Sequence, residues 1–229
     1  KGYNGYAIET RGADYLTVED CTAMNYGYGF IQLASGTALT TVKNVTVSNM
    51  NYGVKVDYSN AVVLENLNLD CAVAAVLNSN YGTKTITIKN SNLSILGTWT
   101  RNNTIKTTYV FEGENSIDDF VIDAAIDNFK LADVNSTLAA PNEITVTTDM
   151  EGYEVEYKDG KYIVVANKVE LVRDGESQGK FATIQAAIDA AQANDVIVLL
   201  KDITEDVTIT KDLTIDGKAE GATANSKYT

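Results

Sequence analysis

One five-residue pattern occurs four times within the first 92 residues of this chain. Each copy has an apolar residue, a charged residue, an Asp or Asn, a variable residue and a Thr or Asn; the copies are Val18-Glu19-Asp20-Cys21-Thr22, Val42-Lys43-Asn44-Val45-Thr46, Leu64-Glu65-Asn66-Leu67-Asn68 and Ile88-Lys89-Asn90-Ser91-Asn92. The Asp or Asn recurs at steps of 24, 22 and 24 residues. A period in the low twenties in β-rich sequence is typical of a solenoid, in which each repeat is one coil.

Apolar and polar residues alternate around each copy, as in Val45 and Val47 or Ile86 and Ile88. Such alternation over short runs indicates half-buried strands with apolar side chains pointing inward. Equivalent strands of successive coils run in the same direction, so the sheets should be parallel and the crossovers right-handed. The return of Met24-Asn25-Tyr26-Gly27 as Met50-Asn51-Tyr52-Gly53 predicts a second corner, with glycine at positive φ.

The recurring Asp20, Asn44, Asn66 and Asn90 have two interpretations. In the structural one, they form an internal ladder in which each side chain bonds the next coil and satisfies backbone groups at the corner. In the functional one, they present a row of polar groups to a ligand. We favour the ladder, because Asn is a common turn residue and needs no ligand to explain it there.

The period fails after Leu96, so we predict that residues 97–150 form one or two irregular coils and a cap or loop. Asp159-Gly160 lies between two alternating runs, residues 153–157 and 161–165, and predicts a β-hairpin. The sequence is thus divided into solenoid coils (1–100), a terminal irregular coil with a hairpin (101–168), and a capping helix with the first strands of a module (169–229).

The last of these parts begins with a helical pattern. Thr183 is a predicted N-cap, and Ile184, Ala187, Ile188 and Ala191 share one helical face. Three strands are predicted after the helix, at residues 196–200, 207–210 and 213–217. A helix that covers the open end of a coil protects an edge that would otherwise pair with other chains.

This part of the chain also resembles a known family. Phe181-Ala182-Thr183-Ile184-Gln185-Ala186-Ala187-Ile188 and Leu213-Thr214-Ile215-Asp216-Gly217 resemble the start of pectate-lyase-like right-handed parallel β-helices, in particular those of large repetitive cell-surface proteins of Gram-positive gut bacteria. The resemblance implies that the hairpin closes one module and the helix opens the next. It implies a fold and not an activity, since this fold hosts lyases, hydrolases and adhesins alike.

Composition excludes several functions. The net charge of −13 opposes binding to nucleic acid or to anionic membrane surfaces. No apolar run approaches the roughly 20 residues of a membrane-spanning helix. The only cysteines, Cys21 and Cys71, lie about two coils apart on the repeat, which is too far for a disulfide, so both are predicted to be free thiols that act as small buried hydrophobic residues.

Catalytic motifs are missing from the sequence. The chain has no histidine, the commonest general base and metal ligand, and no phosphate- or dinucleotide-binding fingerprint. A carboxylate pair on adjacent coils could still hydrolyse a glycoside. The candidates are Asp118, Asp119 and Asp123, or Glu65 with Asp70, and all of them are also readily explained as surface charge. We therefore expect no catalytic residue, no cofactor and no metal site. The sequence lacks an ordered calcium-binding loop, but it does not exclude other kinds of calcium site.

Tyrosine is the strongest sign of binding. Of the thirteen tyrosines, those at the glycine-rich corners offer flat apolar rings with a polar tip, suited to sugar rings or protein surfaces. The alternative is that these rings only pack over the coil corners. The candidate ligand-binding residues are Tyr26, Tyr28, Tyr52, Tyr58 and Tyr81.

We expect a non-catalytic, extracellular repeat module of a bacterial surface protein, acting as a stalk or adhesin scaffold and binding carbohydrate or a host protein. The alternative is part of a carbohydrate-active β-helix enzyme whose site lies outside this segment. Neighbouring copies of the module are the expected partners. The coil at residues 6–23 would leave an open edge, which strands in residues 196–217 should cover, either from the same chain or head to tail from another copy.

Overall fold

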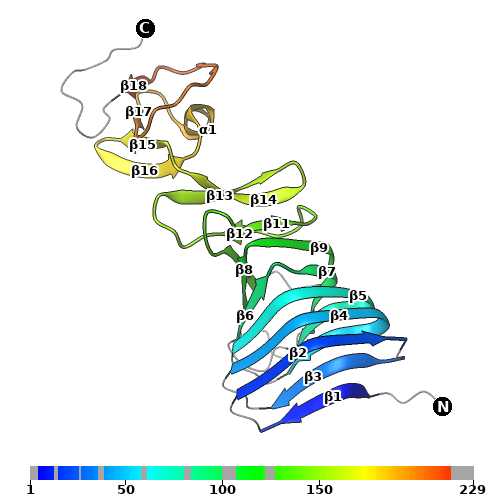
Figure 1. The fold of residues 1–229 in the computed structure, drawn as a ribbon. Coiled ribbons are helices and arrows are strands. Elements are labelled where there is room, and N and C mark those ends of the chain that lie inside the picture. The colour runs from blue at the N-terminus through cyan, green and yellow to red at the C-terminus, as the bar shows by residue number, and fades with distance from the viewer. Residues whose placement is uncertain are drawn as a thin grey trace. The chain divides into compact units, whose positions relative to one another are not determined.

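The computed structural model describes residues 5–12, 15–25, 27–35, 39–57, 61–79, 84–99, 107–121 and 127–217. They divide into two compact units. Unit 1 lies within Lys1–Asp149 and Val155–Val164, and unit 2 within Met150–Glu154 and Val165–Thr229 (Figure 1).

Unit 1 is a parallel β-solenoid of about five turns. Its strands stack coil upon coil, as Figure 1 shows for β2, β4 and β5. Two of them are long because each runs through all three faces of its coil. The strands are β1 (Tyr6–Arg11), β2 (Tyr15–Met24), β3 (Gly29–Ser35), β4 (Leu39–Val56), β5 (Ala61–Ser79), β6 (Lys84–Lys89), β7 (Asn92–Trp99), β8 (Thr107–Glu112), β9 (Glu114–Val121), β10 (Asp127–Leu131), β11 (Thr137–Ala139) and β12 (Val146–Thr147).

Each complete coil has three faces separated by corners. The first face stacks residues 15–19 of β2, 39–43 of β4 and 61–65 of β5, followed by β6, β8, β10 and β12. The second face continues from β2, β4 and β5 through β7 and β9 to β11. The third face contains β1, β3 and the ends of β4, β5, β7 and β9.

The parallel coils extend well past residue 96, so the expectation of irregular structure from 97 onward is wrong. β6, β8 and β10 continue the first face in register, with Ile88 opposite Phe111 and Phe111 opposite Leu131. The repeat could not be recognised in the sequence here because Gly113, with φ +68°, takes the place of the Asp or Asn at the corner. Glycine reaches this left-handed conformation without a side chain, so a search for Asp and Asn misses it.

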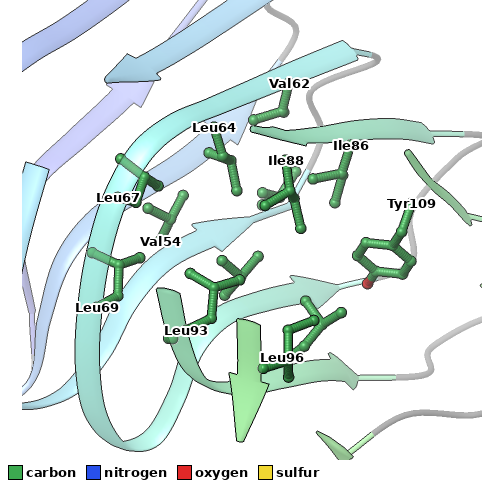
Figure 2. Packing of buried hydrophobic residues seen from close by; sticks show 14 of the residues in the cluster. Val54, Val62, Leu64, Leu67, Leu69, Ile86, Ile88, Leu93, Leu96 and Tyr109 are labelled. Carbon is green, nitrogen blue, oxygen red and sulfur yellow. The ribbon is translucent and has the colours of Figure 1, made fainter. Parts of the chain in front are cut away.

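The core is a set of columns of inward-pointing side chains, one from each coil. The first face contributes Val18, Val42, Leu64, Ile88 and Phe111, of which the last four are fully buried. Figure 2 shows Leu64, Ile88, Leu93 and Leu96 packed around the interior. The inward positions predicted from alternation, including Val45, Leu67 and Ile88, are therefore confirmed as core.

A hairpin closes the second face of unit 1. It consists of β13 (Tyr153–Lys158) and β14 (Lys161–Ala166), and the turn residues Asp159 and Gly160 have φ values of 50° and 79°. β14 pairs antiparallel with β11, with Tyr162 opposite Leu138, so parallel stacking ends there. The predicted hairpin is present at the predicted turn.

Unit 2 has one helix and a small sheet. Its elements are β15 (Val169–Arg173), β16 (Glu176–Phe181), α1 (Ile184–Ala190), β17 (Val196–Leu199) and β18 (Thr214–Asp216), in the sheet order β16-β15-β17-β18. The Thr183 side chain accepts a hydrogen bond from the Ala186 N–H, as an N-cap does. Residues 207–210 form no strand, contrary to prediction, because the Thr208 N–H bonds the Gln185 side chain instead of a neighbouring strand.

Candidate functional site

The Asp and Asn residues of the repeat all lie at the corner between the first and second faces. Asp20, Asn44, Asn66 and Asn90 have φ values of 56°, 52°, 53° and 48°. Asn44 Nδ2 donates to Asp20 Oδ1 at 2.9 Å, and Asn66 Nδ2 donates to Asn44 Oδ1 at 3.1 Å. Asn90 Oδ1 instead accepts from the Glu114 N–H at 3.2 Å. These side chains bond neighbouring coils, as the ladder interpretation requires. The ladder is exposed and not internal, however, and of these bonds only the one from the Glu114 N–H satisfies a backbone group.

A second corner, between the second and third faces, holds a shorter ladder that the sequence analysis missed. Asn25 and Asn49 have φ values of 58° and 52°, and Asn49 Nδ2 donates to Asn25 Oδ1 at 2.6 Å. Their 24-residue separation, the same as that of the main repeat, was the available signal. The predicted glycine corner is wrong: Met24 pairs with Ser48, and Gly53 lies within β4, where a Cβ would be 2.4 Å from the Ala75 carbonyl oxygen.

A row of alternating charges runs along the outer side of the first face. In register from coil to coil it consists of Glu19, Lys43, Glu65, Lys89 and Glu112. Lys43 Nζ lies 2.7 Å from Glu19 and Lys89 Nζ lies 2.6 Å from Glu112. The hydrogen bond with Glu19 raises the pKa of Lys43. Glu65 therefore faces a lysine on each side, and this pairing explains a glutamate at this position without a catalytic role.

Of the other candidate carboxylates, Asp70 and Asp118 line one small hollow on the second face. The hollow has a volume of about 100 Å³, and asparagine and serine side chains form much of its wall. Asp70 and Asp118 are two coils apart, or about 9.6 Å at the usual strand spacing. Asp119 Oδ1 accepts from the Phe120 N–H at 2.8 Å, and Asp123 lies outside the described residues. The hollow is well below the roughly 300 Å³ at which ligand pockets begin.

Three tyrosines gather on the outer side of the third face. The ring centroid of Tyr28 lies 5.2 Å from that of Tyr6 and 5.3 Å from that of Tyr52, and Tyr6 and Tyr52 are 6.2 Å apart. Two of the predicted residues, Tyr28 and Tyr52, are therefore in contact, and Tyr6 joins them. Tyr26, Tyr58 and Tyr81 lie outside the described residues. We call Tyr6, Tyr28 and Tyr52 the tyrosine cluster.

A groove of about 310 Å³ opens beside this cluster. Its floor is the third face, where the small residues Ala74 and Gly97 leave space above the strands. Its walls include the exposed apolar side chains of Val73 and Val121, which are 45% and 60% exposed. The groove combines the tyrosine cluster with Lys55, Val73, Ala74, Leu77, Gly97, Thr98 and Val121. It has an aromatic wall, an apolar floor and one cationic side chain.

The cationic side chain is held by a buried carboxylate. Lys55 Nζ lies 3.1 Å from Asp57 Oδ2, Gln32 Nε2 donates to the same oxygen at 2.5 Å, and Ser79 Oγ donates to Asp57 Oδ1. Burial alone would raise the pKa of Asp57, but the bonds from Ser79, Gln32 and Lys55 outweigh it and hold this pKa below its usual value. Lys55 is thereby fixed at the edge of the groove.

A second lysine, Lys84, is 2% exposed and lies inside the solenoid. Its Nζ donates to the carbonyl oxygens of Val56 at 3.1 Å and of Ser79 at 2.8 Å, to that of Asp57, and to Asn78 Oδ1 at 3.2 Å. Burial lowers the pKa of Lys84 to about 8. Lys84 thus ties together the ends of β4 and β5. No sequence pattern pointed to this role of Lys84. The alternation in its strand predicts that residue 84 points inward, but it does not predict which groups a polar side chain bonds there.

Other kinds of site find little support in the part of the chain that the structure describes. There, no three His, Cys, Asp or Glu side chains are placed to hold a metal ion together. None of the described helices has the length and apolar character to cross a membrane. Cys21 and Cys71 are both free thiols; Cys71 is buried as predicted, whereas Cys21 is only partly buried. Known protein families, curated proteins and solved structures were all compared with this chain, and none of them matches it.

Proposed function

We propose that this chain is a non-catalytic module of an extracellular bacterial surface protein, a solenoid scaffold whose groove binds carbohydrate. The observation that carries the proposal is the tyrosine cluster beside the groove. Tyrosine rings offer a flat apolar face for the C–H groups of a sugar ring, while their hydroxyl groups remain available for hydrogen bonds. Pockets that bind small molecules are mostly apolar with a few well-placed polar groups, as this groove is.

The polar groups of the groove suit a sugar as well. Lys55 donates hydrogen bonds and is held in place by Asp57, so little side-chain entropy is lost when a ligand binds. A cation also favours a sugar that carries a carboxylate, such as a uronic acid. The pectate-lyase-like resemblance of the sequence implies a fold and adds nothing to the choice of ligand. The localisation on a bacterial surface, and the role as stalk or adhesin, rest on that resemblance alone.

The alternative function, a glycoside hydrolase or polysaccharide lyase, has one observation in its favour. Asp70 and Asp118 line a common hollow at a spacing of about 9.6 Å, just above the range of roughly 6.5–9.5 Å for inverting glycosidases. The hollow is small, however: its volume of about 100 Å³ is well below that of a ligand pocket. Binding without turnover is therefore the better supported function.

The test is binding to an array of neutral and uronic-acid oligosaccharides, followed by calorimetry with those that bind. Tyr52→Ala should weaken binding at least tenfold, and Tyr52→Phe, which keeps the ring, should retain most of it. Tyr15→Ala is the matched control, because Tyr15 is 77% exposed on the first face, away from the groove. If no oligosaccharide binds, or if Tyr52→Ala and Tyr15→Ala bind equally well, the proposal is wrong.

A further inference from the structure

The groove beside the tyrosine cluster is not uniform along its length. Its lining residues come from successive coils, and the register of the strands divides them into two halves. The tyrosine cluster and Lys55, from the coils of β1, β3 and β4, form what we call the aromatic half. What we call the apolar half is lined by residues of β5, β7 and β9, namely Val73, Ala74, Leu77, Gly97, Thr98 and Val121.

The apolar half has little to offer a polar ligand group. Thr98 is the one residue with a polar side chain among the described residues that line this half. Its hydroxyl group is used inside the solenoid, where Oγ1 donates to Asp127 Oδ2 at 2.7 Å and lies 3.1 Å from the Tyr109 hydroxyl oxygen. β7 pairs with β5 on one side and with β9 on the other, so its backbone N–H and C=O groups are taken up by the sheet. A ligand in this half therefore meets mainly apolar surface.

The two halves are far enough apart to hold two different rings of a ligand. Tyr52 lies on β4 and Gly97 on β7, two strand spacings away, or about 9.6 Å. A single sugar ring is narrower than this, so a ring stacked on the tyrosine cluster leaves the space above Gly97 to a second ring. The groove volume of about 310 Å³ is at the lower end for small-molecule sites, which limits the ligand to a short oligosaccharide.

The apolar half selects the chemistry of the second ring. A hydroxyl group placed against Val73 and Leu77 would lose its water without gaining a hydrogen-bond partner, which is unfavourable. A methyl group in the same place would bury apolar surface, which is favourable. A 6-deoxyhexose has a methyl group where a hexose has a hydroxymethyl group. An acetamido sugar has a methyl group as well, but it also brings an N–H and a carbonyl oxygen for which this half has no partner.

We propose that the groove binds a short oligosaccharide in which one ring stacks on the tyrosine cluster and the next ring is a 6-deoxyhexose, whose methyl group lies in the apolar half over Gly97. This inference rests on the proposed function and adds to it the class of sugar. The tyrosine cluster supplies the stacking surface that many sugars share, and the apolar half distinguishes one sugar from another.

Gly97 leaves the space that the methyl group fills. A Cβ on residue 97 would lie 3.2 Å from Leu77 Cδ1 and 3.6 Å from both Ala74 Cβ and the Val121 carbonyl oxygen. Only the flexible end of the Leu77 side chain has to shift, so alanine fits on the strand, but its own methyl group then takes up the space. Gly97→Ala should therefore keep the fold and weaken binding of the 6-deoxyhexose ring.

The experiment is calorimetry of the full chain with pairs of disaccharides, each in both orders of linkage. The two members of a pair share one ring, and the other ring is a hexose in one member and the matching 6-deoxyhexose in the other. The 6-deoxyhexose member should bind about fivefold more tightly or better, since it buries a methyl group and leaves no hydroxyl group unpaired. Tyr52→Ala should weaken both members, because both use the aromatic half.

Val73→Thr tests the apolar half with almost no change of shape. Val73 is 45% exposed, so the variant should fold, and a hydroxyl group in place of a methyl group should lower the preference for 6-deoxyhexose at least twofold. Val134→Thr is the matched control, because Val134 is similarly exposed, lies between β10 and β11, and does not line the groove. This control should leave the preference unchanged, and circular dichroism of each variant verifies that it folds.

The outcomes separate this inference from the proposed function. Equal affinity for the two members of every pair, with Tyr52→Ala weakening both, overturns the inference and leaves the proposed function standing. A preference that Val73→Thr lowers no more than Val134→Thr does overturns the inference as well. If no disaccharide and no longer oligosaccharide binds, the proposed function is wrong and the inference falls with it.

Discussion

Gly29 lies directly beneath the ring of Tyr6 in the tyrosine cluster. A Cβ on residue 29 would lie 2.3 Å from a ring carbon of Tyr6, so no side chain fits while the ring stays in place. Tyr6 and Gly29 are partners in the register of β1 and β3, and Gly29 is in turn the partner of Tyr52. The groove wall therefore depends on a residue that makes no contact with the groove itself.

Gly29→Ala should displace the Tyr6 ring and weaken carbohydrate binding, with a modest loss of stability of about 1–3 kcal/mol from overpacking. Calorimetry with the bound oligosaccharide and near-ultraviolet circular dichroism of the tyrosines measure the two effects. Gly27→Ala is the control, since a Cβ there has no neighbour within 4 Å. Equal affinity for the wild type and Gly29→Ala would show that Tyr6 is not part of the binding wall.

Because Lys84 is buried, the free energy of unfolding of unit 1 should change with pH in the alkaline range. Its pKa of about 8 lies below the roughly 10.4 of a lysine in an unfolded chain. Between these values the unfolded chain binds the extra proton, so the free energy of unfolding should rise as the pH increases from about 8 to about 10.4. The measurement is urea denaturation across that range.

Lys84→Met removes the titrating group while keeping an unbranched side chain, so the difference between wild type and variant isolates the contribution of Lys84. The variant should lose the rise in stability and should be less stable throughout, because the carbonyl groups of Val56 and Ser79 lose their donor. Parallel pH profiles for the two proteins would contradict this account of Lys84.

In unit 2, Asp195 links a strand to the end of α1. Its side chain is 2% exposed, accepts a bidentate bond from Arg173 at 2.9 and 2.8 Å, and accepts the Gln192 N–H at 2.7 Å. The bond from Arg173 lowers the pKa of Asp195 to about 2. This stabilisation is present above the unfolded pKa of about 3.9 and should be lost as the pH falls from there towards 2.

Hydrogen exchange of the β15 and β17 amides reports on unit 2 separately from unit 1. Protection there should fall between about pH 4 and pH 2 in the wild type. In Asp195→Asn it should be lower at neutral pH and show less change with acid. If the wild type and the variant lose protection in parallel, Asp195 does not control the acid stability of this unit.

The core columns can be tested by deletion of single side chains. Leu67 is 2% exposed, and Leu67→Ala should lower the free energy of unfolding by about 2–5 kcal/mol through lost burial and the cavity left behind. Val73→Ala is the control, because Val73 is 45% exposed and should change stability by no more than about 0.5 kcal/mol. Denaturant titration measures both, and a loss below about 1 kcal/mol for Leu67→Ala would contradict the assigned packing.

The sequence predicted the solenoid and its core because those features repeat. Val45, Leu67 and Ile88 could be assigned to the interior from alternation, and Asn44 and Asn66 to a corner from their spacing. The continuation past Leu96 was missed because the corner changes to Gly113 while the inward column carries on through Phe111 and Leu131. A pattern tied to one residue type fails where another type adopts the same conformation.

The candidate site was less predictable, since it depends on side chains from different coils meeting on the outer surface. Tyr28 and Tyr52 could be named from composition, but Tyr6 joins them only through the register of β1, β3 and β4. Asp57 and Lys84 have no repeating partner in the sequence. Their role follows from burial and from bonds such as Lys84 to Ser79, which involve backbone carbonyl groups that no sequence pattern marks.

The most direct test of binding without turnover follows both events in one sample. The wild-type chain is incubated with the oligosaccharide that binds it, while NMR records the tyrosine ring resonances and a chemical assay records new reducing ends and unsaturated products. Our account predicts shifts of the Tyr6, Tyr28 and Tyr52 rings with no product formed. New reducing ends or unsaturated sugar, abolished by Asp70→Asn or Asp118→Asn and accompanied by no change at the tyrosine rings, would contradict it.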